Sequence, residues 1–248
     1  MTSKTKFDPA AQLDQKVVVI IGGSSGIGLE VGVQARAQGA KLVLVGRSAD
    51  KVRHAAAQVG AGAVALTADA HDHAKLEDLF ARLPPFDHLV SLVGDTMAGG
   101  YLDAPLEVMR HVIESKFWTN LLIGRLAAAR VRDGGSLVFT SGTGARAHEA
   151  SASYTANSAL SCMVEGMASE LAPRVRVNVV APTFMDTALW RDRDRDYVKR
   201  RKEGFAAVAA LKRLGTPEET AHAYVFLMTN TFTTGQTIKV DGGVMLRK

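Results

Sequence analysis

The stretch KVVVIIGGSSGIG, residues 16–28, decides the fold of this chain. Its five consecutive β-branched apolar residues, 17–21, predict a strand buried on both faces, as in a parallel sheet covered by helices. Glycines follow at positions 22, 26 and 28, and residues 29–37 continue as a helix that Gly39 can end. Strand, glycine-rich turn and helix together form the first unit of a parallel α/β sheet.

The same turn is a predicted phosphate site. Ile27 and Gly28 lie at the start of the helix, where free N–H groups and the helix dipole attract anions. Glycines allow the backbone to turn tightly and to approach a ligand closely. Because a buried strand precedes the glycines and a helix follows them, the pattern favours a pyrophosphate-binding turn over a tight turn without a ligand.

Strand-like and helix-like segments alternate along the rest of the chain, without repeats. This alternation predicts a doubly wound parallel sheet of about seven strands, a Rossmann fold of the α/β class. We expect one domain over residues 16–248 behind an N-terminal tail, residues 1–15. A (β/α)8 barrel is the alternative, disfavoured by the glycine turn after the first strand and by a long irregular insertion before the last. The further strands are predicted at 41–45, 63–67, 89–93, 137–140 after the pair Gly134 and Gly135, 175–180 and 238–240. The further helices are predicted at 48–59, with Ser48 as the N-cap, and at 76–83, 106–131 and 152–171.

Composition limits the class of protein. With 248 residues, 47% of them hydrophobic, the chain can bury one sizeable core. One cysteine, Cys162, excludes an intramolecular disulfide, and no apolar run reaches membrane-spanning length. Residues 1–8 lack the apolar segment of a signal peptide, so we expect a soluble, cytoplasmic protein with no membrane partner. The net charge of +5 suits an anionic ligand, and we expect no nucleic acid partner.

Much of the basic excess lies in the run WRDRDRDYVKRRK, residues 190–202. Such runs usually form a solvated helix face. The alternative is a basic lid over an acidic substrate or carrier protein, and the run itself does not decide between them.

Several motifs resemble the short-chain dehydrogenase/reductase family. They are the Gly-x-x-x-Gly-x-Gly spacing at 22–28, Ser141 followed thirteen residues later by Tyr154, and the ending TGQTIKVDGG at 234–243. The resemblance spans about residues 13–243. It implies a nicotinamide dinucleotide cofactor, a small-molecule carbonyl or alcohol substrate, and a homo-oligomer, either a dimer or a tetramer.

The end of the second strand predicts the choice of cofactor. An acidic residue there would bind the ribose hydroxyl of NAD, whereas this chain has Arg47 and Ser48, and an arginine accommodates the 2′-phosphate of NADP. The alternative is a surface arginine at a helix start. The fourth strand reads SLVG at 91–94 where the family usually has Asn-Asn-Ala-Gly, so we expect backbone rather than Asn contacts there. The glycine turn, the end of the second strand and the family resemblance together predict the cofactor-binding residues Gly22, Ser24, Ser25, Gly26, Ile27, Gly28, Arg47, Ser48, Asp69, Ala70, Gly94, Pro182, Met185 and Thr187, of which Asp69, Ala70 and those from Gly94 onward come from the resemblance. The alternative for Asp69 is a helix cap.

The resemblance implies a catalytic pair, with Tyr154 as the proton donor and Ser141 as the group that stabilises charge on the carbonyl oxygen. The family's lysine four residues after the tyrosine is replaced by Ser158. Its loss is expected to impair oxidation of an alcohol more than reduction of a ketone. Lys116 stands where the family's long helix usually has Asn, and we hypothesise that its ammonium replaces the missing charge.

Two other functions remain open from the sequence alone. The chain could bind the cofactor without redox turnover, as a sensor or assembly subunit, or it could catalyse a non-redox reaction in the same pocket. Residues 184–205 are the expected substrate lid, in which Phe184, Met185, Leu189 and Trp190 line an apolar pocket opposite His148 and Glu149, or simply pack together. His71 and His73 flank Asp72, and we expect no metal site there.

Overall fold

The computed structural model describes residues 12–187 and 194–246. These residues form a seven-stranded sheet in the order β3-β2-β1-β4-β5-β6-β7, in which every pairing is parallel. The predicted doubly wound sheet is therefore confirmed and the barrel is wrong. The strands are β1 (Val17–Ile21), β2 (Lys41–Gly46), β3 (Val64–Thr67), β4 (Phe86–Ser91), β5 (Val131–Thr140), β6 (Arg176–Pro182) and β7 (Thr237–Val240).

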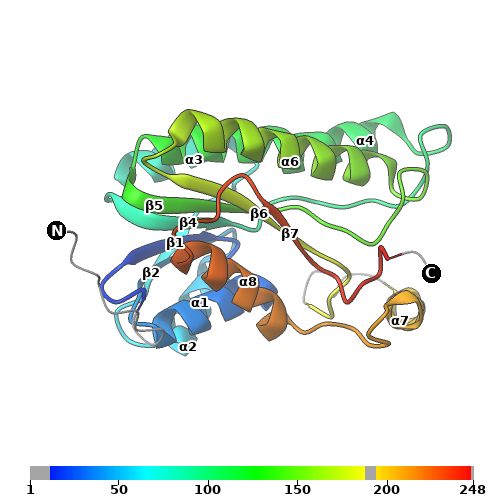
Figure 1. Cartoon of the computed structure of the whole chain (residues 1–248), viewed down its shortest axis with the longest axis horizontal. Helices are drawn as coiled ribbons and strands as arrows, with labels where there is room; N and C mark the ends of the chain where they lie inside the picture. The colour runs from blue at the N-terminus through cyan, green and yellow to red at the C-terminus, as the bar shows by residue number, and fades with distance from the viewer. Residues whose placement is uncertain (1–11, 188–193, 247–248) are drawn as a thin grey trace.

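Helices cover both faces of the sheet (Figure 1). One apolar core lies beneath α3 (His73–Arg82), α5 (Thr119–Ala128) and α6 (Ser151–Leu171). The other lies beneath α1 (Gly26–Ala37), α2 (Ala49–Val59) and α8 (Pro217–Thr229). Because both faces are covered, β1 is almost completely buried from Val18 to Ile21, as its unbroken apolar sequence requires. Helix α7 (Arg195–Val208) stands apart from both layers, beyond β6 and β7 (Figure 1).

Among the strands, β5 and β4 differ most from their predicted boundaries. Strand β5 begins at Val131 rather than at 137, and it runs through Gly134 and Gly135. A side chain at Gly135 would place its Cβ 2.2 Å from the carbonyl oxygen of Asp87, so this glycine allows β5 to pass close to β4. The glycine pair, interpreted from the sequence as a break before the strand, lies within it. Strand β4 is displaced toward the N-terminus, at 86–91 instead of 89–93.

The helix predicted at 106–131 is three segments. Helix α4 (Leu106–Ile113) and α5 are joined by a π-helical turn, η1 (Glu114–Trp118). A π turn inserts one residue into the helical repeat, and such turns are frequent at functional sites. Hydrophobic periodicity does not reveal a single insertion of this kind.

Leu13, within the predicted tail 1–15, is buried among the side chains beneath α1 and α2. Residues 1–11 lie outside the described part of the chain. None of the helices in the described ranges is both long and apolar enough to cross a membrane.

Candidate active site

The segments that follow β1 to β6 open onto one cavity of about 1130 Å³ at the carboxyl edge of the sheet. In open α/β sheets ligands bind at this edge. Every residue that the sequence analysis assigned to cofactor binding or catalysis lines the cavity, although the roles of these residues stay predictions. Topology accounts for this convergence, since parallel strands bring all their carboxyl ends to one side.

At the turn after β1, the backbone is packed so closely that Gly28 has no room for a side chain. A Cβ there would lie 2.3 Å from the carbonyl oxygen of Gly22. Helix α1 begins with no side-chain cap from Ser25 and no acidic residue in its first turn. By contrast, α2, α3 and α8 are capped by Ser48, Asp72 and Thr216. Uncapped N–H groups that open onto a cavity fit the diphosphate of a dinucleotide.

Basic and hydroxyl groups gather at the end of β2. Arg47 is exposed and lines the cavity. Ser24 packs against Gly46, and the Oγ of Ser24 lies 3.1 Å from the position that a Cβ on residue 46 would take. The predicted N-cap of α2 is confirmed, because the Oγ of Ser48 accepts a bond of 3.4 Å from the N–H of Lys51. Lys51 also lines the cavity and was missed from the sequence. Its place in the first turn of α2, four residues after Arg47, is the signal that could have revealed it.

Asp69 and Ala70 follow β3 and line the same cavity. The Asp69 carboxylate accepts a bond of 3.1 Å from the N–H of His71, while Asp72 caps α3 through the N–H of Lys75. Asp69 is therefore not the helix cap, which was the other interpretation of this residue. His73 Nε2 lies 3.6 Å from a carboxylate oxygen of Glu114.

Lys116 lies at the centre of the π turn and is only 7% exposed. Its Nζ donates a bond of 2.9 Å to Oδ1 of Asn157 on α6. Burial lowers the pKa of Lys116 from 10.5 to about 8, with an opposing contribution from the Asp95 carboxylate. The lysine chain passes over Gly94, where a Cβ would lie 3.1 Å from Cε of Lys116 and where φ is +139°. Glycine at 94 therefore makes room for Lys116.

Tyr154 and Ser141 come from neighbouring elements. Ser141 directly follows β5 and is buried, whereas Tyr154 lies in the first turn of α6 and is 43% exposed. Asn157, one turn after Tyr154, packs against Gly142, with its Nδ2 3.2 Å from the position of a Cβ there. The Lys116–Asn157 bond thus brings an ammonium to the face of α6 that carries Tyr154. Ser158 donates a bond of 3.0 Å to the carbonyl of Tyr154.

Asn120 is a residue of the site region that the sequence analysis missed. It is fully buried on α5, accepts a bond of 2.6 Å from Ser91 and donates one of 3.0 Å to the carbonyl of Val93. A further bond of 2.6 Å goes to the carbonyl of Lys116. Asn120 therefore ties the end of β4 to the π turn, so side-chain amide bonds do brace this part of the sheet. An asparagine directly before the apolar run Leu121–Ile123 is the signal that could have identified it.

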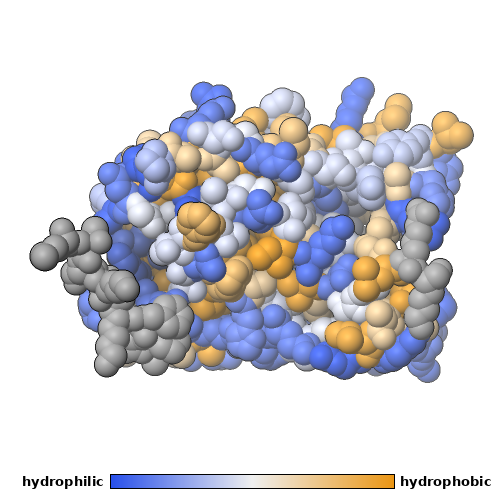
Figure 2. All heavy atoms as spheres, viewed as in Figure 1, coloured by the Kyte–Doolittle hydropathy of each residue, from blue (hydrophilic) through white to orange (hydrophobic). Residues whose placement is uncertain are grey.

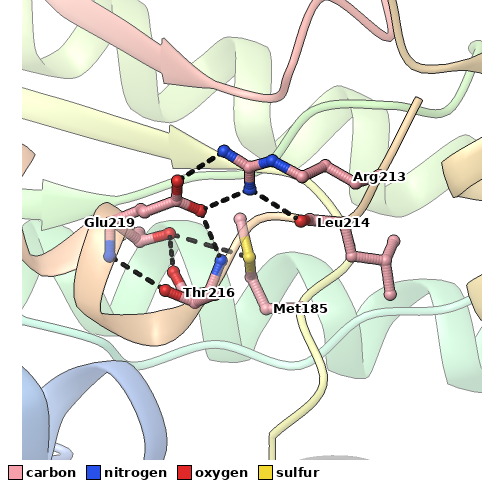
Figure 3. Close-up of polar contacts among 6 residues, drawn as sticks. Met185, Arg213, Leu214, Thr216 and Glu219 are labelled. Atoms are coloured by element: carbon pink, nitrogen blue, oxygen red, sulfur yellow. Dashed lines mark hydrogen bonds and ion pairs between the residues drawn. The ribbon is translucent and has the colours of Figure 1, made fainter. Parts of the chain in front are cut away.

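The segment that follows β6 is held near its start by the contacts of Met185 with the turn before α8 and with α8 itself. Figure 3 shows the turn that holds it: Thr216 caps α8 in a capping box with Glu219, and Arg213 binds both carboxylate oxygens of Glu219. Thr220 lies 3.7 Å from Sδ of Met185, which also packs against Gly215.

The remaining predicted residues of this segment divide as follows. Pro182 ends β6, and Thr187 lies against Gly26 of the glycine turn, 3.2 Å from the position of a Cβ there. Phe184, Met185 and Glu149 line the cavity. His148 is exposed and does not line it, so that part of the lid prediction is wrong. Leu189 and Trp190 lie outside the described residues.

A parallel sheet with a glycine turn, an uncapped α1 and one long cavity at its carboxyl edge defines the class of dinucleotide-binding α/β proteins. Residues 22–245 match the family model described as enoyl-(acyl carrier protein) reductase. The chain belongs to this family of short-chain dehydrogenases/reductases.

Relatives along the whole chain agree with this assignment. Short-chain dehydrogenase/reductase fsr5 of Gibberella fujikuroi is 30% identical, with 92% of this chain and 94% of the relative covered. The human 3-oxoacyl-[acyl-carrier-protein] reductase is 31% identical, with 93% and 98% covered. A crystal structure of a small-chain dehydrogenase in complex with NADPH has a TM-score of 0.80 at 26% identity and covers 94% of this chain and 100% of that one. These relatives support an oxidoreductase that uses a nicotinamide cofactor.

Proposed function

We propose that this protein is an NADPH-dependent carbonyl reductase acting on a small molecule. The observation that carries the proposal is the single cavity that joins the uncapped start of α1 to Ser141 and Tyr154. Arg47 and Lys51 would hold the 2′-phosphate, and the α1 N-terminus the diphosphate. When bound, the cofactor supplies a hydride to the carbonyl carbon.

The protein's own groups act on the carbonyl oxygen. The Tyr154 hydroxyl donates a proton to it, and the Ser141 hydroxyl donates a hydrogen bond that stabilises its developing charge. The Lys116 ammonium, held by Asn157, supplies positive charge beside α6. Because Ser158 is neutral, we propose that this charge comes from Lys116 alone and that reduction is favoured over oxidation.

Arg47→Ala is expected to weaken NADPH binding roughly 10- to 100-fold, the loss that follows removal of a charged hydrogen bond. NADH, which has no 2′-phosphate, should bind the variant and the wild type equally. Titration of nicotinamide fluorescence measures both affinities. Arg53→Ala is the matched control, because Arg53 lies on α2, pairs with Asp50 and does not line the cavity. If neither nucleotide binds wild-type protein at millimolar concentration, the reductase proposal is wrong.

Lys116→Met is expected to lower the rate of ketone reduction at pH 7 by roughly tenfold or more, since a cation near the reacting oxygen is removed. In the wild type the Lys116 pKa of about 8 means that the ammonium is present below this pH and lost above it. The rate should therefore fall as pH rises through about 8, and this part of the pH profile should be absent in the variant. Methionine avoids burying a charge, so urea denaturation should show no loss of stability.

The control for Lys116→Met is Lys41→Met, because Lys41 is exposed at the opposite end of β2. An unchanged rate and pH profile in Lys116→Met would show that Lys116 has no part in the reaction.

We also propose a cytoplasmic homo-oligomer, as the family resemblance implies. Apolar side chains around α4 and η1 support it, since Leu102, Leu106 and Trp118 are 102%, 66% and 49% exposed. Light scattering after gel filtration distinguishes a dimer or tetramer from a monomer.

A further inference from the structure

Beyond Tyr154, the cavity is lined by basic side chains of α7 that the proposed chemistry does not use. Arg200 and Arg201 both line it. Arg201 is partly buried, and its Nε is covered by protein and has no hydrogen-bond partner among the residues that the structure describes. A covered Nε does not face open space, so Arg201 contributes the charge of its guanidinium to the cavity rather than a hydrogen bond from Nε.

The Arg201 guanidinium is supported by an aromatic stack. Its Cζ lies 4.7 Å from the centre of the Phe205 ring, and Phe205 stacks on Phe184 with ring centres 5.5 Å apart. Phe205 packs in turn against Gly144, with its Cε1 2.6 Å from the position of a Cβ there. Since Gly144 is three residues after Ser141, continuous packing connects Arg201 to the segment that carries the predicted catalytic serine.

Two acidic groups near this end of the cavity already have partners, whereas Asp196 and Glu203, one helical turn from Arg200 on α7, are exposed. Asp186 pairs with Lys202 at 2.5 Å, and Oε2 of Glu149 accepts a bond of 2.8 Å from the N–H of Arg146. Within residues 12–187 and 194–246, neither Arg200 nor Arg201 forms an ion pair. The two guanidinium groups therefore give this end of the cavity a positive charge that the described residues do not neutralise.

Apolar side chains adjoin these arginines. Val208 and Met245 line the cavity, and Leu211 and Leu246 are exposed beside them, at 65% and 72%. Leu246 lies 3.0 Å from the Cβ position of Gly243, and Figure 2 shows apolar side chains gathered around α7 at this end of the molecule. A ligand that fits this surface combines an anionic group with an apolar body.

We propose that this end of the cavity binds an organic carboxylate, so that the substrate is a carbonyl compound that also carries a carboxylate group. Arg201, assisted by Arg200, binds the carboxylate, because a guanidinium matches its two oxygens and stays charged. The apolar residues receive the rest of the molecule. The position of both arginines on the cavity wall favours a small molecule over an acidic protein, which would meet only the outer surface. The identity of the substrate rests on the proposed function, whereas the anion site does not.

Calorimetry with hexanoate and hexanamide tests the anion site without turnover. Hexanoate is expected to bind the wild type at least tenfold more tightly than the neutral amide, and Arg201→Gln is expected to abolish this preference. Lys199→Gln, also on α7 but outside the cavity, should leave it unchanged. Equal binding of acid and amide overturns the proposal. So does a preference that is lost in Arg47→Ala and kept in Arg201→Gln, because the anion would then occupy the cofactor end.

Kinetics separate this proposal from the proposed function. With NADPH, straight-chain oxo acids should be reduced with a higher kcat/KM than their methyl esters, and Arg201→Gln should lower kcat/KM roughly 10- to 100-fold for the acids alone. If acids and esters are reduced equally well, the proposal is wrong. If none is reduced while hexanoate binding still depends on Arg201, the reductase function is wrong and the carboxylate site is supported.

Discussion

Tyr154→Phe is expected to lower the rate of ketone reduction by roughly 10²- to 10⁴-fold, the contribution typical of a positioned proton donor. Phenylalanine keeps the ring and removes only the hydroxyl group that we propose protonates the carbonyl oxygen. Because Tyr154 is 43% exposed, its hydroxyl is not needed for core packing, and stability should change by less than about 0.5 kcal/mol. Single-turnover oxidation of bound NADPH measures the effect on chemistry, and a titration shows whether cofactor affinity is preserved.

Tyr101→Phe is the matched control for this variant. The Tyr101 hydroxyl bonds to Thr155 Oγ1 at 2.8 Å, on the residue next to Tyr154, yet it is not part of the cavity lining. Its loss should leave turnover unchanged. If Tyr154→Phe retained the wild-type rate, protonation by this residue would be excluded. If wild type bound NADPH tightly and reduced no ketone, the protein would be a cofactor binder without redox turnover.

The fold was predictable because its strongest signals are local. Five β-branched residues before the glycines specify a buried strand, and Ser48 caps α2 where its position predicted. Residues at the ends of strands could also be assigned to one cavity, since parallel topology brings those ends together. The same reasoning failed at Gly135, where close approach to Asp87 determines the conformation and the partner is 48 residues away.

The parts of the site that were missed depend on contacts between distant segments. The bond from Lys116 to Asn157 links residues 41 positions apart, and Lys116 lies in the π turn, whose extra residue changes the direction of every later side chain. Asn120 likewise bonds to Ser91 and Val93, 29 and 27 positions away in the sequence. The run at 190–202 is basic by its sequence, but only the folded chain shows that Arg200 and Arg201 line the cavity and that Arg201 lies over the Phe205 ring.

Gly28→Ala is expected to have the largest effect on the folded state and on the cofactor site together. Its Cβ would lie 2.3 Å from the Gly22 carbonyl oxygen and 3.1 Å from Cα of Gly23. Both contacts are with backbone, so relief requires the turn itself to move, and we expect a loss of about 3 kcal/mol in the free energy of unfolding. Urea denaturation measures this loss.

The displaced turn would also carry the N–H groups of α1 away from the cofactor's diphosphate, and NADPH affinity should fall at least tenfold in the molecules that remain folded. Gly166→Ala is the control, since Gly166 lies within α6 and nothing occupies the space within 4 Å of its Cβ position. That variant should gain roughly 0.5–1 kcal/mol from helix propensity and bind NADPH normally. Equal stability and equal affinity in the two variants would mean that the turn tolerates a methyl group and that its close packing does not shape the cofactor site.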